Sequence, residues 1–399
     1  MKEICMTVMG TRGDVFPVAA LANVLSGTNR VTVITSPDQT PFFERIRLTA
    51  LAVGEDFSAV AGSGDIARFR RQAAAQFDAH REAYERADVI VGAGLFYAGR
   101  TLAEHYGKPY YHLFYTPQVL QSARYAPAGY PRPFAGRLRN RLLWLKSGGE
   151  SDFLLRRLIN GKRKELALPP IGSVYGHFNC GPGTIIAMDA CLARVPPRYA
   201  AVKQIDFPYY EDRQPLSGAL QTFLANGSAP VVIGFGSAEH TAGDIRELLR
   251  QTVEAVRGLG CRAVVLSSAG GEACGEGPDM FCCGYAPHAA LLPRTRAIVH
   301  HGGAGTVYAA LKCGIPQVIV PQGMDQFYWA DTVESRGWGK SASMAGGPRA
   351  TPLRDALRAV LNGEGVGDGL TEIAGRLNGE RHRKESLQKL RAVMPECFA

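Results

Sequence analysis

Two adjacent histidines precede a glycine-rich turn where an apolar run meets an amphipathic one. His300 and His301 follow the apolar residues 297–299 and precede Gly-Gly-Ala-Gly at 302–305. Glycine lets a ligand approach the backbone, and a helix N-terminus presents free N–H groups with about half a unit of positive charge. Either imidazole could donate to the same anion. The pattern predicts an anion site in a strand–turn–helix unit with Thr306 as N-cap; an ordinary loop histidine is the alternative interpretation.

A carboxylate occupies a comparable place in the first half of the chain. Asp14 follows the apolar run 4–9 and lies in the sequence Gly10-Thr-Arg-Gly-Asp14. As the N-cap of a helix over 15–25 it would stabilise that helix by about 1 kcal/mol and do nothing else. As a general base it would lie on a turn at the ligand edge of a sheet. The position alone leaves both roles open.

Alternating strand and helix patterns are expected to position these residues. Strands are predicted at 4–9, 31–35, 51–53, 88–91 and 110–113, and after a break at 231–233, 262–266, 280–283, 297–299 and 317–320. Helical patterns separate them, at 15–25, 66–86, 96–106 and 242–259 among others. This alternation predicts parallel sheets covered on both faces, which bind ligands beyond the carboxyl ends of their strands.

The length and a compositional break predict two domains. A chain of 399 residues exceeds one ordinary domain, and a Pro- and charge-rich stretch interrupts the periodicity at 206–215. We expect an N-terminal domain over 1–210 and a C-terminal domain over 217–380. A basic helix within 381–399 could pack back on the N-terminal domain.

Composition points to a cytoplasmic protein with free thiols. No apolar run approaches the ~18 residues of a membrane span, and the start of the chain lacks the pattern of a signal peptide. The nine cysteines are scattered without Cys-x-x-Cys spacing. Cys282 and Cys283 fit a buried strand better than a disulfide.

Positive charge is concentrated in one segment. The formal net charge is +9, and residues 132–164 contain ten basic and two acidic side chains, a net +8. Leucines and aromatics lie between the charges, which argues against nucleic acid as the partner. Three interpretations stay open: helices beside an acceptor cleft, a peripheral contact with an anionic membrane such as the inner membrane, or a solvated face.

A dinucleotide fold explains the glycine turn poorly. Tyr308 stands where Gly-x-Gly-x-x-Gly requires its third small residue, and the first strand is not followed by such a fingerprint. A dehydrogenase is therefore not expected.

Five motifs occur in the order and spacing of a known family. They are Gly10-Thr-Arg-Gly-Asp-Val-Phe-Pro17, Gly234-Phe-Gly-Ser237, Gly284-Tyr-Ala-Pro-His288, His300-His-Gly-Gly-Ala-Gly-Thr306, and Pro316 through Asp325-Gln326. In these motifs the chain resembles small-molecule (UGT-like, family 1) glycosyltransferases, in particular bacterial glycopeptide and sterol glycosyltransferases and the rhamnolipid rhamnosyltransferase. The resemblance covers nearly the whole chain. It implies the α/β GT-B fold, with two Rossmann-like doubly wound parallel-sheet domains facing a central cleft.

The resemblance also implies a role for each matching residue of the second half. The donor diphosphate would be held by His301, by the backbone of Gly303, Ala304, Gly305 and Thr306, and by Ser237. Tyr285 and Ala286 would line the nucleobase pocket, and Asp325 and Gln326 would bind the sugar hydroxyls. His300 is then expected to support the turn.

In the first half, the resemblance makes Asp14 the general base. Residues 60–165 should build the acceptor site. The residues expected to contact the acceptor are Thr11, Arg12, Phe96 and Tyr115. Hydrophobic small molecules, either natural products or hydroxy-lipids, suit the aromatic content of this region.

The implied reaction is inverting, metal-independent transfer of a sugar from a UDP- or dTDP-sugar to a hydroxyl. Oriented amides and a histidine would stabilise the leaving diphosphate, no Asp-x-Asp tripeptide occurs, and no cofactor is expected. A nucleotide-sugar epimerase or hydrolase on the same frame is the alternative. The donor sugar, the base, the acceptor and the oligomeric state stay open.

Overall fold

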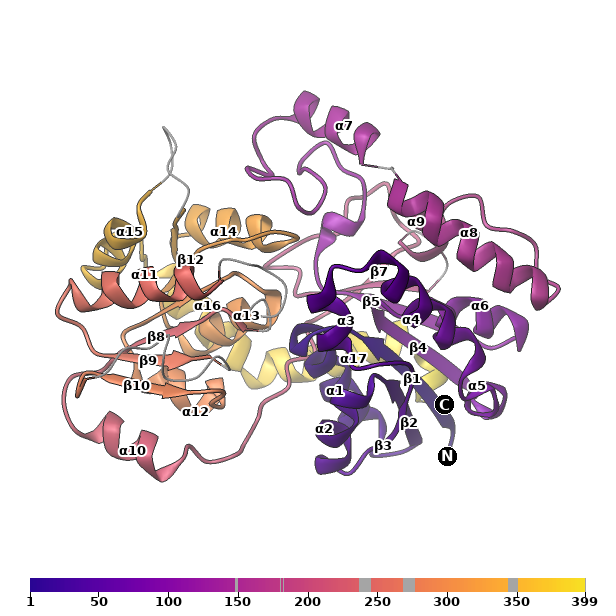
Figure 1. Cartoon of the computed structure of the whole chain (residues 1–399), viewed down its shortest axis with the longest axis horizontal. Coiled ribbons are helices and arrows are strands. Elements are labelled where there is room, and N and C mark those ends of the chain that lie inside the picture. The colour runs from indigo at the N-terminus through magenta and orange to yellow at the C-terminus, as the bar shows by residue number, and fades with distance from the viewer. Residues whose placement is uncertain are drawn as a thin grey trace. The chain divides into compact units, whose positions relative to one another are not determined.

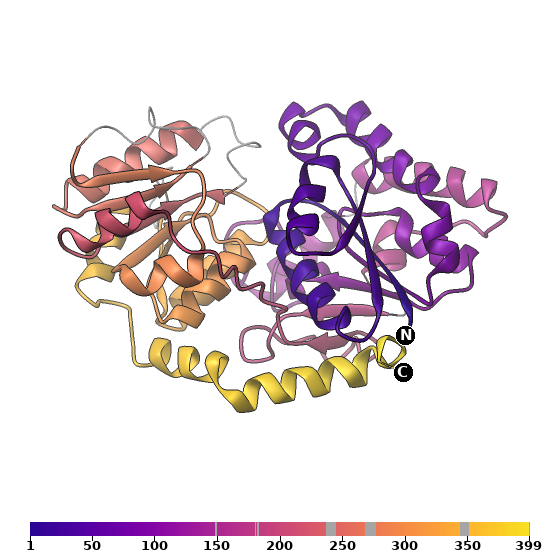
Figure 2. The same cartoon turned by 90° about the horizontal axis from the view of Figure 1, so that it is seen from below.

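The chain folds into two compact units. The computed structural model describes residues 1–147, 150–179, 181, 183–236, 245–267, 277–343 and 351–398. Unit 1 comprises Met1–Pro127, Ala135–Tyr210 and Lys384–Ala399, and unit 2 comprises Ala128–Phe134 and Glu211–Arg383. The N- and C-terminal ends lie close together in unit 1 (Figures 1 and 2).

Unit 1 is built on a parallel sheet of seven strands in the order β3-β2-β1-β4-β5-β6-β7. The strands are β1 Glu3–Met9, β2 Arg30–Thr35, β3 Thr49–Ala52, β4 Val89–Gly94, β5 Tyr110–Phe114, β6 Thr184–Ala187 and β7 Lys203–Ile205. Its helices include α1 Arg12–Leu25, α2 Thr40–Arg45, α3 Phe57–Ser63, α4 Ile66–Asp78, α5 Arg81–Arg86, α6 Ala98–His105, α7 Arg137–Lys146, α8 Glu150–Glu165 and α9 Val174–Phe178.

Both faces of this sheet are buried, as expected for parallel strands. Along β1, Met6 and Val8 belong to a core that also contains residues of α1, whereas Cys5 and Met9 belong to a core on the opposite face. Successive side chains of a strand point to opposite faces, so an almost continuous apolar run is needed here.

Unit 2 is built on a second parallel sheet, in the order β10-β9-β8-β11-β12-β13. Its strands are β8 Val231–Gly234, β9 Ala263–Leu266, β10 Met280–Cys283, β11 Ala297–His300, β12 Gln317–Ile319 and β13 Gly339–Ser341. Its helices include α10 Gly218–Ala225, α11 Ile245–Arg257, α12 His288–Leu291, α13 Ala304–Cys313, α14 Gln326–Ser335, α15 Leu353–Leu361 and α16 Gly369–Asn378.

Each sheet reverses its strand order once. The reversal lies between β1 and β4 in unit 1 and between β8 and β11 in unit 2. Loops leaving the carboxyl ends of these neighbours diverge to opposite sides, which opens a crevice where doubly wound sheets bind ligands. We call these two places the switch points: residues 10–14 and 94–97 in unit 1, and residues 234–236 and 300–306 in unit 2.

The C-terminal segment is anchored on unit 1. The chain ends after helix α17, Glu380–Val393. Lys389 Nζ lies 2.7 Å from a carboxylate oxygen of Asp206, and the Asn29 side-chain amide donates to the Cys397 carbonyl at 2.9 Å. Leu390 joins the core that contains α1.

The structure confirms the predicted strands to within three residues at either end and corrects several local expectations. The N-cap of α1 is Thr11 and that of α13 is Gly303, so neither Asp14 nor Thr306 is a cap. The helical stretch predicted over 66–86 divides into α4 and α5 because His80 adopts a positive φ of 53°.

Two further expectations concern cysteines and membranes. Among the described residues, six cysteines are free thiols, Cys283 among them, but Cys282 is disulfide-bonded, so the expectation of free thiols is wrong there. Within the described residues, no helix combines the length and apolar character needed to cross a bilayer.

Candidate functional site

The turn between β1 and α1 holds the Asp14 carboxylate by a capping box. Asp14 is the N3 residue of α1, and its Oδ2 accepts from the Thr11 backbone N–H at 2.9 Å and from the Thr11 hydroxyl at 3.4 Å. In return, Thr11 Oγ1 accepts from the Gly13 N–H at 3.2 Å. The reciprocal bonds satisfy N–H groups that the first turn leaves without helical partners. They also fix the orientation of the carboxylate.

Two glycines make room for Asp14 at the switch point of unit 1. A Cβ added at Gly10 would lie 2.2 Å from Asp14 Oδ2. A Cβ added at Gly94, which has φ +62°, would lie 2.3 Å from the Met9 carbonyl oxygen and 3.3 Å from the Asp14 Cβ. The ends of β1 and β4 therefore approach each other closely around this side chain.

Tyr115 completes this group from the end of β5. Its hydroxyl donates to the Asp14 backbone carbonyl at 3.3 Å, and burial together with the Asp14 charge raises its pKa well above the ordinary value. Of the four residues expected to touch an acceptor, Thr11 and Tyr115 thus lie beside Asp14. Arg12 is exposed in the same turn.

Phe96, the fourth of these residues, lies in the β4–α6 loop. Its side chain is 0% exposed and packs in the core on one face of the sheet. In this structure it offers no exposed surface.

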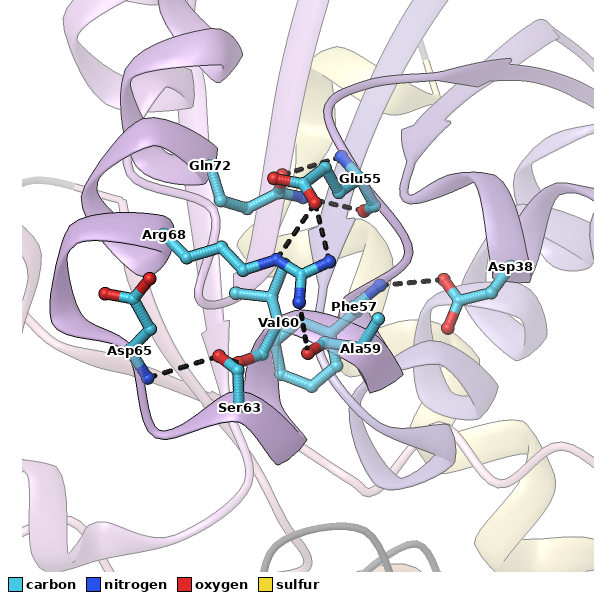
Figure 3. A network of polar contacts seen from close by, with 9 residues as sticks. All are labelled: Asp38, Glu55, Phe57, Ala59, Val60, Ser63, Asp65, Arg68 and Gln72. Atoms are coloured by element: carbon cyan, nitrogen blue, oxygen red, sulfur yellow. Dashed lines mark hydrogen bonds and ion pairs between the residues drawn. The ribbon is translucent and has the colours of Figure 1, made fainter.

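Two buried glutamines, not anticipated from the sequence, hold the loops around Asp14. The Gln72 side chain accepts from the Glu55 N–H at 2.8 Å and donates to the Glu55 carbonyl at 3.0 Å (Figure 3). One turn later on α4, Gln76 accepts from the Tyr97 N–H at 2.7 Å and donates to the Leu95 carbonyl at 3.1 Å. The available signal was two polar residues, spaced i and i+4, on the buried face of a helix.

Charged residues fix the outside of the same loops. Arg68 pairs with Glu55 at 2.6 Å and donates to the Ala59 carbonyl at 3.1 Å (Figure 3). The Asp38 carboxylate accepts from the Phe57 N–H at 3.1 Å. The loops after β2 and β3 are consequently fixed to each other and to α4.

In unit 2, His300 supports the turn, as the sequence suggests. It is fully buried, its Nδ1 accepts from the Gly302 N–H at 3.1 Å, and its Nε2 lies 3.0 Å from Gln317 Oε1. A nitrogen that accepts carries no proton, so the ring is neutral with its proton on Nε2. Burial agrees with this, because it lowers the His300 pKa to about 3.

His301 lies between two glycines at the switch point of unit 2. A Cβ added at Gly236 would be 3.0 Å from its Cε1, and one added at Gly303 would be 2.6 Å from its Nε2. Burial lowers the His301 pKa to about 4, partly opposed by a hydrogen bond with the Gly234 backbone. The end of β8 and the start of α13 thus approach the half-buried ring closely.

A helix N-terminus lies beside His301. Gly303 is the N-cap of α13 and contributes no side-chain cap within the described structure. The N–H groups of Thr306 and Val307 both point to the Gly303 carbonyl, each at 3.0 Å. The amides of Ala304 and Gly305 precede the first helical bond, so the turn concentrates N–H dipoles next to the imidazole.

The loop after β12 packs against this turn. A Cβ added at Gly302, which has φ +96°, would lie 3.2 Å from the Gln326 carbonyl oxygen. Asp325 Oδ2 accepts from Trp329 Nε1 at 3.0 Å, and burial raises the Asp325 pKa. The Gln326 side-chain oxygen accepts from the N–H of Gln322 at 2.7 Å, so this oxygen shapes the loop. Both predicted sugar-binding residues therefore lie next to the histidine turn.

The predicted nucleobase residues lie farther along the sheet. Tyr285 follows β10, and its hydroxyl donates to Asp212 Oδ2 at 2.9 Å, whereas Ala286 is buried. Strands β9 and β8 separate this position from the switch point. Ser237, predicted to assist the diphosphate, lies outside the described residues.

A short segment from the first half of the chain contributes to unit 2. Within Ala128–Phe134, the Gly129 N–H donates to the Met324 carbonyl at 2.8 Å, and the Phe134 ring centroid lies 5.3 Å from that of Tyr328. Met324 immediately precedes Asp325, so the segment contacts the loop after β12. Sequence reasoning assigned this segment to the N-terminal domain.

Comparison with known proteins identifies the family. The chain is 32% identical over 373 residues to glycosyltransferase GtfC of Amycolatopsis orientalis, covering 90% of this chain and 89% of the relative. The chain belongs to this glycosyltransferase family. The vancomycin aglycone glucosyltransferase of the same organism is 31% identical with the same coverage of both chains. Residues 263–392 of this glycosyltransferase match the C-terminal domain model of erythromycin biosynthesis protein CIII-like proteins.

Solved structures support the fold assignment. The glycosyltransferase of kitacinnamycin is similar with a TM-score of 0.70 at 21% identity, covering 98% of this chain and 97% of the other. Glycosyltransferase VinC, solved in complex with dTDP, has a TM-score of 0.63 at 20% identity, covering 99% of both chains. The glycosyltransferase therefore has the GT-B fold, with two Rossmann-like parallel-sheet units.

Proposed function

We propose that the enzyme transfers a sugar from a UDP- or dTDP-sugar to a hydroxyl of a hydrophobic small molecule, with inversion and without a metal. One observation carries the proposal: at the switch point of unit 2, a half-buried imidazole lies beside a helix N-terminus that has no N-cap side-chain bond in the described residues. Such an arrangement suits a diphosphate, because N–H dipoles and an imidazole stabilise the charge on the leaving group.

The names of relatives support the choice of substrates. Relatives in Amycolatopsis orientalis include a vancomycin aglycone glucosyltransferase and a dTDP-epi-vancosaminyltransferase, 31% and 29% identical to this chain. These names point to nucleotide-sugar donors and to a natural product as acceptor.

The base of the reaction would be Asp14. An acceptor O–H bond breaks as its proton passes to the carboxylate, and the oxygen bonds to C1 of the sugar. The bond from C1 to the diphosphate oxygen breaks, and its electron pair stays on the diphosphate. Because the acceptor oxygen attacks C1 from the opposite face, the configuration at C1 is inverted. The capping box supports the assignment because it holds the carboxylate at the switch point where unit 1 would bind a ligand.

Asp14→Asn tests the base. Asparagine keeps the oxygen that accepts from Thr11 and removes only the basic carboxylate, so we expect turnover to fall about 10²- to 10⁴-fold with unchanged nucleotide affinity. Sugar transfer is measured in EDTA with UDP- and dTDP-sugars. Asp56→Asn, an exposed carboxylate in the loop after β3, is the matched control. Turnover near that of the wild type would remove Asp14 from the mechanism, and a requirement for added Mg²⁺ would contradict metal independence.

His301→Ala tests the diphosphate site. Loss of the imidazole should weaken UDP or dTDP binding by roughly tenfold or more, the loss expected for one hydrogen bond to a charged group. Calorimetry measures the affinity, and thermal unfolding checks that the variant is folded. Unchanged affinity would exclude His301 as a phosphate ligand. Incubating the donor alone separates transfer from epimerisation, because an epimerase converts the donor without an acceptor.

A further inference from the structure

Helix α7 touches the rest of unit 1 along one side. Trp144 Nε1 donates to the Tyr125 carbonyl at 2.9 Å, and Asn140, fully buried, donates to the Ala123 carbonyl at 3.4 Å. The Trp144 ring centroid also lies 6.4 Å from that of Tyr175 on α9. Asn140 and Trp144 are four residues apart, so they mark one face of the helix as its inner side. Figure 1 shows α7 and α9 in this part of unit 1.

The opposite side of α7 is a row of exposed leucines. Leu138, Leu142 and Leu145 are 72%, 57% and 83% exposed. Their spacing, i, i+4 and i+7, places them on a single stripe, and a rotation of about 100° per residue puts that stripe opposite Asn140 and Trp144. Scattered apolar residues on a surface are ordinary, but an aligned row on a helix marks an interaction site.

Basic side chains border this row on both sides. The same rotation places Arg137 and Arg141 along one edge of the leucines and Arg139 and Lys146 along the other. The helix contains no acidic residue. An apolar stripe between two basic borders is the pattern of a helix lying in a membrane interface.

We propose that α7 docks this enzyme on an anionic lipid bilayer. The three leucines would enter the boundary between headgroups and acyl chains, while the exposed Arg137, Arg141 and Lys146 meet the anionic headgroups with their aliphatic stems against the lipid. Charge complementarity favours this occupant over a protein, because both borders carry the same sign and the stripe is purely aliphatic. The proposal goes beyond the transfer reaction and is independent of it.

Vesicle co-sedimentation of the full-length enzyme tests the proposal. We expect binding to vesicles of phosphatidylcholine and phosphatidylglycerol in a ratio of about 3:1 and at least ~10-fold weaker binding to phosphatidylcholine alone. Raising the salt from about 50 mM to about 500 mM should also weaken binding, because screening acts on the headgroup contacts. No sedimentation with the anionic vesicles at low salt would overturn the proposal.

Two variants separate the contributions of the leucines and the arginines. Leu138→Ser/Leu142→Ser/Leu145→Ser should reduce binding about 10-fold or more, and Arg137→Gln/Arg141→Gln should reduce it and flatten its salt dependence. Ile66→Ser, which removes a 66% exposed apolar side chain from α4 of the same unit, should bind like the wild type. All variants should retain nucleotide affinity, since α7 lies outside the proposed donor site.

One result would assign the leucine row to a different occupant. If light scattering shows a dimer that the triple serine variant dissociates, and vesicles do not bind, the row is a contact between two copies of the chain. That outcome overturns the membrane proposal while leaving the transfer reaction untouched.

Discussion

The two units share one topology and present groups of opposite charge character at its switch point. Each sheet is parallel and reverses its strand order once. The switch point lies between β1 and β4 in unit 1 and between β8 and β11 in unit 2. Unit 1 presents a carboxylate there, and unit 2 presents an imidazole and backbone N–H groups. The topology therefore determines where a ligand can bind. The residues in the first turn of the following helix determine whether the switch point suits a negatively charged ligand.

The difference comes down to two positions in the helix that leaves each switch point. In α1 the N-cap is Thr11 and the N3 residue is Asp14, which close a capping box. In α13 the N-cap is Gly303, and the N3 position is Thr306. The first helix satisfies its terminal N–H groups with its own side chains and keeps a negative charge. Within the described residues, the second has no side-chain cap at its N-terminus, which carries the positive end of the helix dipole.

Thr306→Asp would transfer the acidic N3 residue to unit 2 and should have the largest effect. The carboxylate would repel a diphosphate and compete for the same amides, so nucleotide affinity should fall about 10²-fold or more. An acidic residue in the first turn also stabilises a helix by about 0.3–1 kcal/mol, so unfolding should not become easier. Calorimetry and thermal unfolding measure the two quantities.

The neutral Thr306→Asn variant is the matched control, because it has the same shape without the charge. Affinity lost equally in both variants would mean that shape, and not charge, governs the site. The contrast between the two units would then rest on sterics.

Paired glycine substitutions test whether each switch point holds its own side chain in place. Gly303→Ala adds a methyl group 2.6 Å from His301 Nε2, and Gly10→Ala adds one 2.2 Å from Asp14 Oδ2. Each side chain must move, so we expect roughly 10- to 100-fold losses. The Gly303→Ala loss should appear in nucleotide affinity, and the Gly10→Ala loss in turnover at saturating donor.

The pair also contains its own control. Each variant should leave the other quantity within a few-fold of the wild type. If Gly10→Ala weakened nucleotide binding as strongly as Gly303→Ala, the assignment of separate roles to the two switch points would fail.

How far the sequence leads differs between elements. The strands with continuous apolar runs, such as β1 and β8, were predicted because parallel strands need such runs on both faces. Strands β7 and β13, with the sequences Lys-Gln-Ile and Gly-Lys-Ser, lack the apolar run that marked other strands of the same length, and β6 was also missed. The motif residues of the histidine turn could be placed because their chemistry and spacing are local.

Other features depend on contacts distant in sequence and could not be derived locally. Gln72 and Gln76 act on loops 17 to 21 residues away, and Phe96 is buried in a core that also contains residues of β1, α4 and α5. The segment Ala128–Phe134 belongs to unit 2 through Met324 and Tyr328, nearly two hundred residues later. The composition of this segment does not indicate that it belongs to unit 2.

Both units contain buried neutral histidines, which make the stability of each unit depend on pH. Burial lowers the pKa of His112 and His177 in unit 1 to about 3 each, as it does for His300 in unit 2. The folded state keeps these rings neutral, whereas the unfolded chain binds protons below its pKa of about 6.5. Stability is therefore complete above pH 6.5 and declines as the pH falls towards 3.

We expect His112→Gln to reduce this pH dependence measurably in unit 1. A histidine that stays neutral in the folded state lowers the free energy of unfolding by ~1.4 kcal/mol at pH 5.5 relative to pH 7.5, because the unfolded chain binds a proton there. Glutamine can still bond with the Tyr110 hydroxyl, which lies 2.7 Å from His112 Nδ1. Urea unfolding at pH 7.5 and 5.5 measures the difference in the free energy of unfolding between the two pH values. A loss of stability that the substitution causes equally at both pH values cancels in this difference. An unchanged difference would mean that His112 is protonated in the folded state, and that its bond with Tyr110 overrides the effect of burial.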